Sequence, residues 1–414
     1  MSSPHVTKRL TCRVCRSSTV APFLNLGEFP PANNFLRKEE LTLKEDRFPL
    51  ELSFCSDCGL VQVLDIVNPA LLFGDYPYFT SASKPLSDHF ARMAESIHER
   101  YLNGTKQLVV EMGSNDGTLL AALFQKGARV LGVEPAETVG QSARLRGVET
   151  VQAFFSEALA KKIKDSKGEA QVIVASNVFA HIDDLDDVVR GVKYLMADKG
   201  VFISEVHYLD DLIHHGGYDQ VYHEHLSYFS LKPLKYLFER FGLDIIDVNF
   251  FDIHGKLLRV TAAHQGAFKP DSKVAALIQE EDKEGLHSED TFHIFAQGVM
   301  QHRKELIRLI KELRQDGKTI VGYGAPAKGN TLLNYCNLGS DFIDYLIDTT
   351  PAKQGTFAPG TRLAVHPPEK TEKDPPDYFL LLAWNYADYI FEKEKEFHSQ
   401  GGRFIVPFPL PKIV

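Results

Sequence analysis

The chain has 414 residues, of which 44% are hydrophobic and 24% charged, a composition typical of a globular protein with more than one domain. A net charge of −9 and a pI near 6.0 argue against a general nucleic-acid binder, because phosphate binding needs a basic surface. No apolar run approaches the ~20 residues of a membrane-spanning helix and the first residues lack an apolar signal segment, so we expect a cytoplasmic protein.

Four of the five cysteines form two C-x-x-C pairs in the first part of the chain. The pairs are Cys12 with Cys15 and Cys55 with Cys58. Two such pairs can supply the four thiolates of a tetrahedral zinc site, and a site with four protein ligands is structural rather than catalytic. The alternative is two disulfides or free thiols, and the lack of an export signal disfavours disulfides. We expect residues 1–72 to form a small zinc-binding module with a strand at 50–54.

The middle of the chain alternates between helical and strand-like patterns. Apolar residues three and four apart predict a helix over 86–101. Short hydrophobic runs then predict strands at 107–112, 128–134, 170–175 and 200–206. Strands that alternate with helices are typical of a doubly wound parallel sheet. We assign residues 73–245 to this central Rossmann-like domain.

The last part of the chain, residues 246–414, repeats this alternation after a helical connector. Charged segments with recurring apolar residues predict antiparallel helices between about 270 and 315. A second strand–helix series begins at 318 and continues with strands at 342–348, 377–383 and 402–407. The predicted fold is therefore α/β, with an N-terminal zinc module, a central Rossmann-like domain and a second Rossmann-like domain at the C-terminal end.

Three features of the central domain predict a nucleoside cofactor. The first predicted strand leads into a turn where Gly113 and Gly117 allow a ligand to approach the backbone, and Glu134 ends the next strand, where a carboxylate can accept hydrogen bonds from both ribose hydroxyls. Asn177, after the following strand, can face the methionine part of S-adenosylmethionine. The third glycine of G-x-G-x-x-G is missing and Asp116 would repel a pyrophosphate, so we predict a class I S-adenosylmethionine-dependent methyltransferase. The expected cofactor-binding residues are Glu111, Gly113, Asn115, Asp116, Gly117, Glu134, Pro135, Phe154 and Asn177.

Further short motifs occur in all three parts of the chain. They are PANNF at 31–35, YPYF at 76–79, QVYHEHLSYF at 220–229, GYGAPAKGNT at 322–331, DTTPAKQG at 348–355, PGT at 359–361 and AWN at 383–385. With these motifs the chain resembles the sugar C-methyltransferase family, whose members add a methyl carbon to nucleotide-linked 4-keto-deoxysugars. One departure is HGKLLR at 254–259, where the family pattern has a second glycine and a serine before the arginine. The resemblance implies deoxysugar biosynthesis, with methylation at C3 of a 4-keto-6-deoxyhexose and dTDP as the family's commonest nucleotide.

This chemistry requires a base and a hydrogen-bond donor in one pocket. A sulfonium methyl can be attacked by carbon only if the carbon beside the ketone loses its proton and becomes part of an enolate. We expect His225 to be the base, because imidazole titrates near working pH, with Glu224 orienting it and Tyr222 donating to the ketone or enolate oxygen. His181 and Tyr76 are expected to border the same pocket, and the family resemblance supports all five residues.

The C-terminal glycine run has several interpretations. At the start of a helix, residues 324–330 could present backbone amides to a diphosphate, helped by Lys328. The run could instead bind NAD and make the protein bifunctional, or form a plain tight turn. The resemblance assigns substrate nucleotide binding to this domain and so favours the diphosphate. The expected substrate-binding residues are Tyr78, Tyr323, Gly324, Ala325, Lys328, Asn330, Lys353 and Asn385.

Other functions stay open from the sequence. An O- or N-methyltransferase on another small molecule would need no enolate, and a zinc-containing binding protein with a non-catalytic methyltransferase fold would bind no S-adenosylmethionine. The histidines between 207 and 225 could hold a second metal, although the order His-Glu-His at 223–225 does not match H-E-x-x-H. We expect a monomer whose partner is a nucleotide-diphospho-4-keto-deoxysugar, with no nucleic acid or membrane partner.

Overall fold

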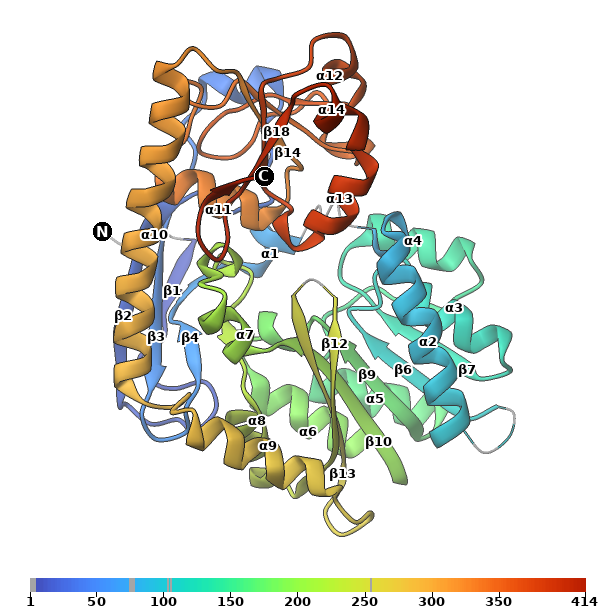
Figure 1. Ribbon diagram of the computed structural model, residues 1–414. Helices are drawn as coiled ribbons and strands as arrows, with labels where there is room; N and C mark the ends of the chain where they lie inside the picture. The colour runs from blue at the N-terminus through green and yellow to red at the C-terminus, as the bar shows by residue number, and fades with distance from the viewer. Residues whose placement is uncertain (1–4, 74–78, 103, 105, 254) are drawn as a thin grey trace.

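The computed structural model describes residues 5–414 except 74–78, 103, 105 and 254. Figure 1 shows three parts: blue N-terminal strands beside the long helix α10 (Glu289–Gln315), a cyan-to-green sheet domain, and an orange-to-red lobe. Four β-sheets run through the described residues. Within the same residues, no helix is both long enough and apolar enough to cross a membrane.

The N-terminal part is built on an antiparallel sheet that includes a strand from far along the chain. Its order is β11-β4-β3-β2. The strands are β2 (Val20–Phe29), β3 (Phe48–Cys55), β4 (Val61–Val63) and β11 (Ser227–Tyr228), and β1 (Val6–Lys8) pairs separately with β5 (Asp65–Val67). The predicted strand at 50–54 is confirmed within β3. Because Ser227 lies two residues after His225, this sheet extends directly to the expected catalytic segment.

The central part is a seven-stranded sheet with helices on both faces, in the order β12-β13-β10-β9-β6-β7-β8. The parallel strands are β6 (Leu108–Met112), β7 (Arg129–Val133), β8 (Thr150–Val151), β9 (Ala170–Ser176) and β10 (Met196–His207). Helices α2 (Lys84–Tyr101), α3 (Thr118–Gln125) and α4 (Glu137–Leu145) pack on one face, and α5 (Glu157–Lys167), α6 (Leu185–Leu195) and α8 (Leu231–Arg240) on the other. The predicted strands at 107–112, 128–134, 170–175 and 200–206 are confirmed. The carboxyl ends of β6, β7 and β9 therefore meet at one edge of the sheet.

The central sheet extends beyond the boundary expected at residue 245. That boundary lies inside β12 (Leu243–Asp252), which pairs antiparallel with β13 (Lys256–His264). β13 in turn pairs antiparallel with β10. A hairpin at the edge of a parallel sheet does not follow the strand–helix alternation, so the alternation could not reveal it. The sheet ends after His264.

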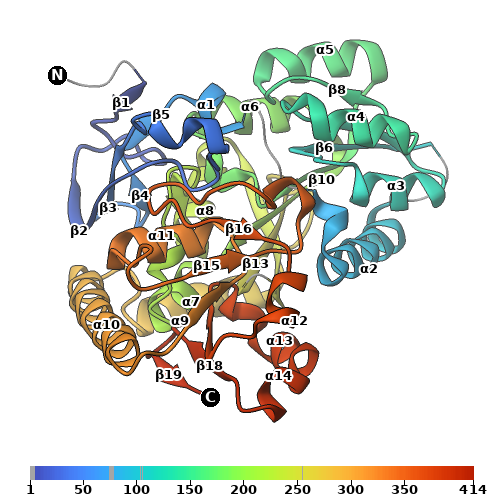
Figure 2. The same cartoon turned by 90° about the horizontal axis from the view of Figure 1, so that it is seen from above.

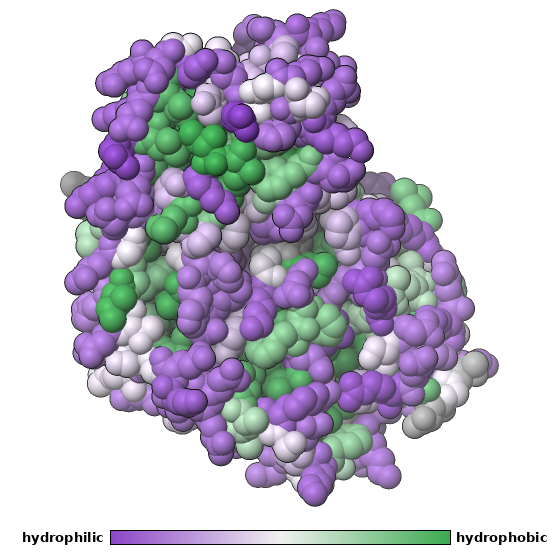
Figure 3. All heavy atoms as spheres, in the orientation of Figure 1, coloured by the Kyte–Doolittle hydropathy of each residue, from purple (hydrophilic) through white to green (hydrophobic). Residues whose placement is uncertain are grey.

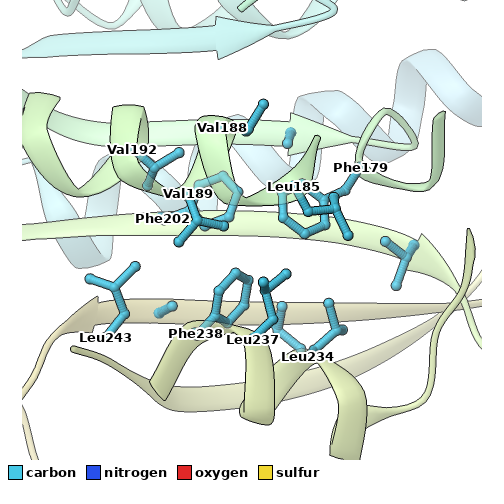
Figure 4. Packing of buried hydrophobic residues seen from close by; sticks show 14 of the residues in the cluster. Phe179, Leu185, Val188, Val189, Val192, Phe202, Leu234, Leu237, Phe238 and Leu243 are labelled. Carbon is cyan, nitrogen blue, oxygen red and sulfur yellow. The ribbon is translucent and has the colours of Figure 1, made fainter. Parts of the chain in front are cut away.

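Aromatic side chains fill the core between α6, β10 and α8. Phe179, Phe202 and Phe238 have ring centroids 5.8 to 5.9 Å apart, and all three are buried. Figure 4 shows Val189 of α6 and Leu237 of α8 among the side chains around them. Truncation of such a buried ring costs about 3–5 kcal/mol. This core fixes the chain at Phe179, two residues before His181.

The helical connector differs from the antiparallel pair that the sequence predicts. The connector consists of α9 (Ser272–Lys283) and α10. α9 packs against α8 and β12, whereas α10 packs against β2 and a helix of the C-terminal domain. Figure 1 shows α10 running along the N-terminal strands while α9 lies under the central domain. The helices are therefore confirmed, but α9 is held by the central domain and α10 by the N-terminal and C-terminal parts.

The C-terminal part is a second, smaller α/β domain. Its sheet has the order β16-β15-β14-β17-β18-β19, parallel except for β19. The strands are β14 (Ile320–Tyr323), β15 (Tyr345–Ile347), β16 (Val365–His366), β17 (Tyr378–Leu381), β18 (Arg403–Val406) and β19 (Lys412–Ile413). The helices are α11 (Ala327–Cys336), α12 (Glu369–Lys373), α13 (Ala387–Lys393) and α14 (Lys395–Ser399). α11 packs against β2, as Figure 2 shows from above. Figure 3 shows apolar side chains gathered on the surface of the C-terminal domain.

Candidate active site

A cavity of about 880 Å³ lies where the three parts of the chain meet. The ends of β6, β7 and β9 form its wall on the central domain, and the loops after β14, β15 and β17 form the facing wall. Asn33 and Pro69 contribute from the N-terminal part. Ligands of α/β sheets bind at the carboxyl ends of strands, so both sheets present their ligand-binding edge to one space.

The glycine turn after β6 is tied to the end of β7. Gly113 has φ +63°, and a Cβ atom there would lie 2.2 Å from a methyl of Val178, so only glycine fits without displacement. The carboxylate of Glu134 accepts a hydrogen bond from the backbone N–H of Asn115 and another from that of Ala136, each 2.9 Å long. Burial raises the pKa of Glu134. The carboxylate faces the cavity in a fixed orientation, as recognition of two ribose hydroxyls requires.

Two acidic residues expected at the cofactor do not line the cavity. Glu111 is buried beneath it, and burial together with Glu134 and Asp116 raises the pKa of Glu111 well above its ordinary value. Asp116 accepts hydrogen bonds from the backbone of Ser81 at 3.1 Å and from the Thr118 hydroxyl at 2.6 Å. Asp116 therefore holds the turn and a neighbouring segment in place rather than facing a cationic group of the cofactor.

A short segment after the expected aromatic loop covers the cofactor turn, and its residues 79–82 are not among the site residues that the sequence predicts. The helix η2 (Thr80–Ala82) lines the cavity together with Phe79. The side-chain oxygen of Asn115 accepts from the backbone N–H of Thr80 at 2.9 Å and from its hydroxyl at 3.1 Å. Tyr76 and Tyr78, expected in this loop, lie outside the described residues. Aromatic residues clustered at 73–79 were the available signal.

His225 and Tyr222 form a hydrogen-bonded pair on the cavity wall. Nδ1 of His225 lies 3.0 Å from the carbonyl oxygen of Gln220, which can only accept, so Nδ1 carries the proton. Nε2 then carries no proton, and its lone pair accepts a hydrogen bond from the Tyr222 hydroxyl at 2.9 Å. Burial, with further contributions from His181 and His207, lowers the pKa of His225 well below its ordinary value. The ring is therefore neutral near pH 7, with its basic nitrogen directed at Tyr222.

His181 lies beside this pair and is held by the main chain of Glu224. Its Nδ1 donates to the carbonyl oxygen of Glu224 at 2.6 Å, and its ring centroid is 5.1 Å from that of His225. Burial lowers the pKa of His181. No group of possible metal ligands among the described residues includes these rings. In the same histidine-rich stretch, however, the exposed His214 forms a group with Asp210 and Glu284 that could hold a metal ion.

The side chain of Glu224 does not orient His225, contrary to the expectation from sequence. One carboxylate oxygen accepts from Asn33 at 3.1 Å, and the other is buried without a partner among the described residues. Burial raises the pKa of Glu224 to about 7. The carbonyl of Gln220 performs the expected orienting role instead. Through its carbonyl and its carboxylate, Glu224 thus links His181 to Asn33 of the N-terminal module.

Lys328 lies on the facing wall of the cavity, within a cluster that joins the two domains. Its Nζ donates to the side-chain oxygen of Asn385 and lies 4.7 Å above the Trp384 ring. Nε1 of Trp384 donates to the carboxylate of Asp219 at 2.6 Å. Burial lowers the pKa of Lys328 to about 8 and raises that of Asp219 to about 6. A cation thus faces the cavity from the start of α11.

The second strand of the C-terminal domain ends in the same arrangement as β7. Asp348 accepts from the backbone N–H of Ala325 at 2.7 Å and from that of Thr350 at 2.8 Å. Gly324, with φ +86°, donates from its N–H to the residue before Asp348, as Gly113 does to the residue before Glu134, both over 2.8 Å. Asp348 is not among the expected site residues, although a carboxylate at the end of a second strand is a recognisable signal.

The cavity brings together most of the predicted site residues. Those that line it are His181, Tyr222, His225, Gly113, Asn115, Glu134, Pro135, Phe154, Asn177, Tyr323, Gly324, Lys328, Lys353 and Asn385. Those that do not are Glu111, Asp116, Gly117, Glu224, Ala325 and Asn330. The amide of Asn330 donates to the carbonyl of Ala32 at 2.8 Å, so it fastens α11 to the N-terminal module instead. The carbonyl of Ala325 accepts from Lys353 at 2.9 Å.

The two cysteine pairs converge as the sequence predicts. The Sγ atoms of Cys12 and Cys58 are 3.5 Å apart, those of Cys15 and Cys55 are 3.4 Å apart, and no disulfide forms among them. All four sulfurs lie within 4.8 Å of one another. A tetrahedron of sulfurs at a Zn–S distance of about 2.3 Å has edges of about 3.8 Å, so the cluster fits zinc.

Comparisons with known proteins match three successive parts of the chain. Family models match a zinc binding domain at residues 12–73, a methyltransferase domain at 86–248 and a C-methyltransferase C-terminal domain at 252–409. The C-methyltransferase NovU of Streptomyces niveus is 40% identical over 404 residues, covering 97% of this chain and 96% of its own length. A ubiquinone biosynthesis O-methyltransferase of Pseudomonas aeruginosa is 30% identical over 130 residues, 30% of this chain and 55% of that protein.

Among solved structures, the glycopeptide N-methyltransferase MtfA with S-adenosylmethionine matches 42% of this chain and 87% of its own, at 13% identity and a TM-score of 0.33. With the matching family models and a relative that aligns over nearly its whole length, the assignment rests on sequence and not on this structural likeness. The chain belongs to the C-methyltransferase family: it is an S-adenosylmethionine-dependent methyltransferase with a four-cysteine zinc-binding domain at its N-terminal end.

Proposed function

We propose that the protein methylates the carbon beside the ketone of a nucleotide-linked 4-keto-6-deoxy sugar, at C3 and with dTDP as the nucleotide. The observation that carries the proposal is the Tyr222–His225 pair, which places a neutral imidazole and a phenol next to each other on the cavity wall. Carbon methylation needs both a base and an oxygen donor. Methyl transfer to an oxygen or nitrogen that is already nucleophilic needs neither the base nor the oxygen donor.

In this proposal His225 removes the proton and Tyr222 holds the ketone oxygen. The Tyr222 hydroxyl first turns from His225 towards the ketone, which frees Nε2 for the proton on the neighbouring carbon. The electron pair of the broken C–H bond passes into the enolate, whose oxygen accepts the hydrogen bond from Tyr222. S-adenosylmethionine, when bound, supplies the electrophilic methyl group. His225 afterwards releases its proton to solvent.

The low pKa of His225 suits this role. A buried imidazole stays unprotonated near pH 7, so Nε2 can take up a proton as soon as the Tyr222 hydroxyl has turned away. The same burial disfavours the imidazolium that forms during proton transfer. The enolate forms beside it at the same moment, and two opposite charges in a buried site stabilise each other strongly. His225 therefore takes up protons from solvent poorly. It takes up the proton of a substrate carbon more readily, because the enolate that forms there is a negative charge next to the imidazolium.

The C-terminal wall supports a nucleotide as the handle of the substrate. Lys328 supplies a buried cation at the start of α11, where backbone N–H groups also favour an anion. Asp348 repeats the arrangement of Glu134 and offers a carboxylate to a nucleoside hydroxyl. The space of about 880 Å³ accommodates two ligands at opposite walls. We therefore place the diphosphate near Lys328 and the sugar near His225.

Mass spectrometry in deuterated water tests the proposal. The enzyme is incubated with a dTDP-linked 4-keto-6-deoxy sugar, with and without S-adenosylmethionine. The expected result is one added methyl in the presence of the cofactor and exchange of the proton beside the ketone, both lost in His225→Gln. Exchange without methylation would mean that the base acts on the wrong sugar. Methylation that persists in His225→Gln would contradict the enolate route.

A further inference from the structure

Arg13 lies inside the C-x-x-C turn of the zinc site and is fully buried, with 0% of its surface exposed. Its side chain leaves the zinc-binding domain. Nε donates to the Asp183 carboxylate at 3.1 Å, and the two terminal nitrogens donate to the carbonyls of Leu226 and Val63, each at 2.8 Å. A fourth acceptor, the side-chain oxygen of Gln62, lies 3.2 Å from one terminal nitrogen. Burial of a guanidinium is costly unless its donors are paired, and these four partners pair it.

Two of these partners adjoin the histidines of the active site. Asp183 lies two residues after His181, and Leu226 directly follows His225. The backbone N–H of Leu226 also donates to the carbonyl of Ala180 at 2.9 Å, so the two histidine segments are already fastened together. The guanidinium of Arg13 bonds to both. A shift of Arg13 would therefore move both rings relative to the cofactor turn.

The root of the Arg13 side chain is fixed by the metal ligands. Cys12 and Cys15 flank it, and the turn is closed by a 3.1 Å hydrogen bond from the Arg16 N–H to the Cys12 carbonyl. The backbone N–H of Arg13 donates to Gln62 at 3.1 Å. A zinc–thiolate cluster thus holds the turn at one end while the guanidinium holds the active-site segments at the other.

We propose that Arg13 is a positioning residue that couples the zinc site to the placement of His181 and His225. The significance of that placement for catalysis rests on the proposed function, whereas the coupling itself does not. The zinc-binding domain then has a role beyond its own folding: loss of the metal disturbs the active site through Arg13. A displacement of about 1 Å at reacting groups lowers rates by up to roughly 100-fold.

Arg16 provides a matched control. It lies in the same turn and forms ion pairs with Asp186 at 2.8 Å and Asp184 at 3.4 Å, at the start of α6. These contacts also join the zinc-binding domain to the central domain. They lie further along the chain from His181 than Asp183 does, at Asp184 and Asp186, and do not reach the segment that carries His225. A role of Arg13 in domain docking alone therefore predicts that variants of the two arginines behave alike.

The experiment compares Arg13→Lys and Arg16→Lys by NMR of ¹⁵N-labelled histidine rings, with the signals assigned from His181→Gln and His225→Gln. Lysine keeps the charge but cannot bond to several groups in one plane. We expect the ring signals of His181 and His225 to shift in Arg13→Lys and not in Arg16→Lys, while zinc content by mass spectrometry and the Kd for S-adenosylmethionine stay near wild type. Unchanged signals in Arg13→Lys, or equal shifts in both variants, would overturn the proposal.

Turnover provides the second measurement and separates this proposal from the proposed function. In Arg13→Lys we expect kcat to fall about 10- to 100-fold with little change in KM for S-adenosylmethionine. If the histidine signals shift but no keto sugar is turned over even by wild type, the coupling stands and the substrate assignment fails. Should Arg13→Lys not fold, Asp183→Asn takes its place by removing the charge of the acceptor that Arg13 shares with Arg9, and unshifted His181 signals in that variant would also reject the proposal.

Discussion

The Tyr222 hydroxyl donates to Nε2 of His225 over 2.9 Å, so the proposed oxygen donor occupies the lone pair that the proposed base needs. The oxygen of a bound ketone competes with Nε2 of His225 for the hydroxyl. Once the ketone takes on enolate character, its oxygen is at least as strong an acceptor as Nε2. In the proposed mechanism the base is therefore released only when a substrate carbonyl is in place. The proposed mechanism thus links proton abstraction to substrate binding without movement of the backbone.

Replacement of His225 by glutamine should remove proton exchange and slow methylation by about 10²- to 10⁴-fold, the usual contribution of a general base. Glutamine retains a polar group that can bond to Tyr222, so the pocket should keep its shape. The measurement is single-turnover methylation with quantified product. The Kd for S-adenosylmethionine, from calorimetry, should stay within about twofold because His225 bonds to Gln220 and Tyr222 and not to the cofactor turn.

Replacement of Tyr222 by phenylalanine should leave the base and remove the donor. We expect kcat to fall by roughly 10- to 1,000-fold, as when one oxyanion donor is lost. The phenol also stabilises neutral His225 by donating to it, so its loss should move the acid limb of the pH–rate profile upwards. An acid limb that stays where it is in wild type would show that the hydroxyl does not govern the protonation of His225.

Ionisation of Glu224 should make the stability of the folded protein depend on pH. Its folded pKa of about 7 lies above that of an exposed glutamate, so the native state binds the proton more tightly. Stability from this group is complete below the unfolded value of about 4.3 and is lost as the pH rises through 7. Glu224→Gln should therefore raise Tm relative to wild type at pH 8 and have little effect at pH 5. Thermal melts at both pH values check this, and an equal shift at both would contradict it.

The fold was largely predictable because strand–helix alternation is a local pattern. Four central strands, the second α/β domain and the cysteine site followed from runs of residues that are close in sequence. What could not be predicted are pairings between distant segments. Nothing local in Ser227 and Tyr228 indicates that they join β4 of the zinc-binding domain, and nothing near Cys12 indicates that Arg13 reaches Leu226. The same holds for Asp116, whose partner Ser81 lies 35 residues away.

Removal of the metal should destabilise the N-terminal part of the chain first. Thiolates released from zinc repel one another at 3.4 to 3.5 Å, and the turns that carry them lose their cross-link. Cys58→Ser should lower the zinc content from one per chain towards zero and lower Tm by several degrees. Metal analysis and circular dichroism measure both quantities. Cys336→Ser, outside the cluster, is the control and should keep its zinc.

The final prediction exploits the parallel between Glu134 and Asp348. Each carboxylate is held by two backbone N–H groups at the end of the second strand of its domain, and both line the same cavity. If one wall binds the cofactor and the other the nucleotide, the isosteric variants should separate the two ligands. Glu134→Gln should raise the Kd for S-adenosylmethionine about 10- to 100-fold and leave the Kd for dTDP unchanged.

Asp348→Asn should give the opposite result in the same calorimetric titrations. An amide cannot accept from both a backbone N–H and a ligand hydroxyl with the strength of a carboxylate, so each loss amounts to one or two charged hydrogen bonds, about 1.5–3 kcal/mol apiece. Weaker binding of both ligands in both variants would mean that the walls do not act separately. If dTDP binding survived Asp348→Asn while Lys328→Met abolished it, the diphosphate would be the group recognised, and the nucleoside would have to lie away from the end of β15.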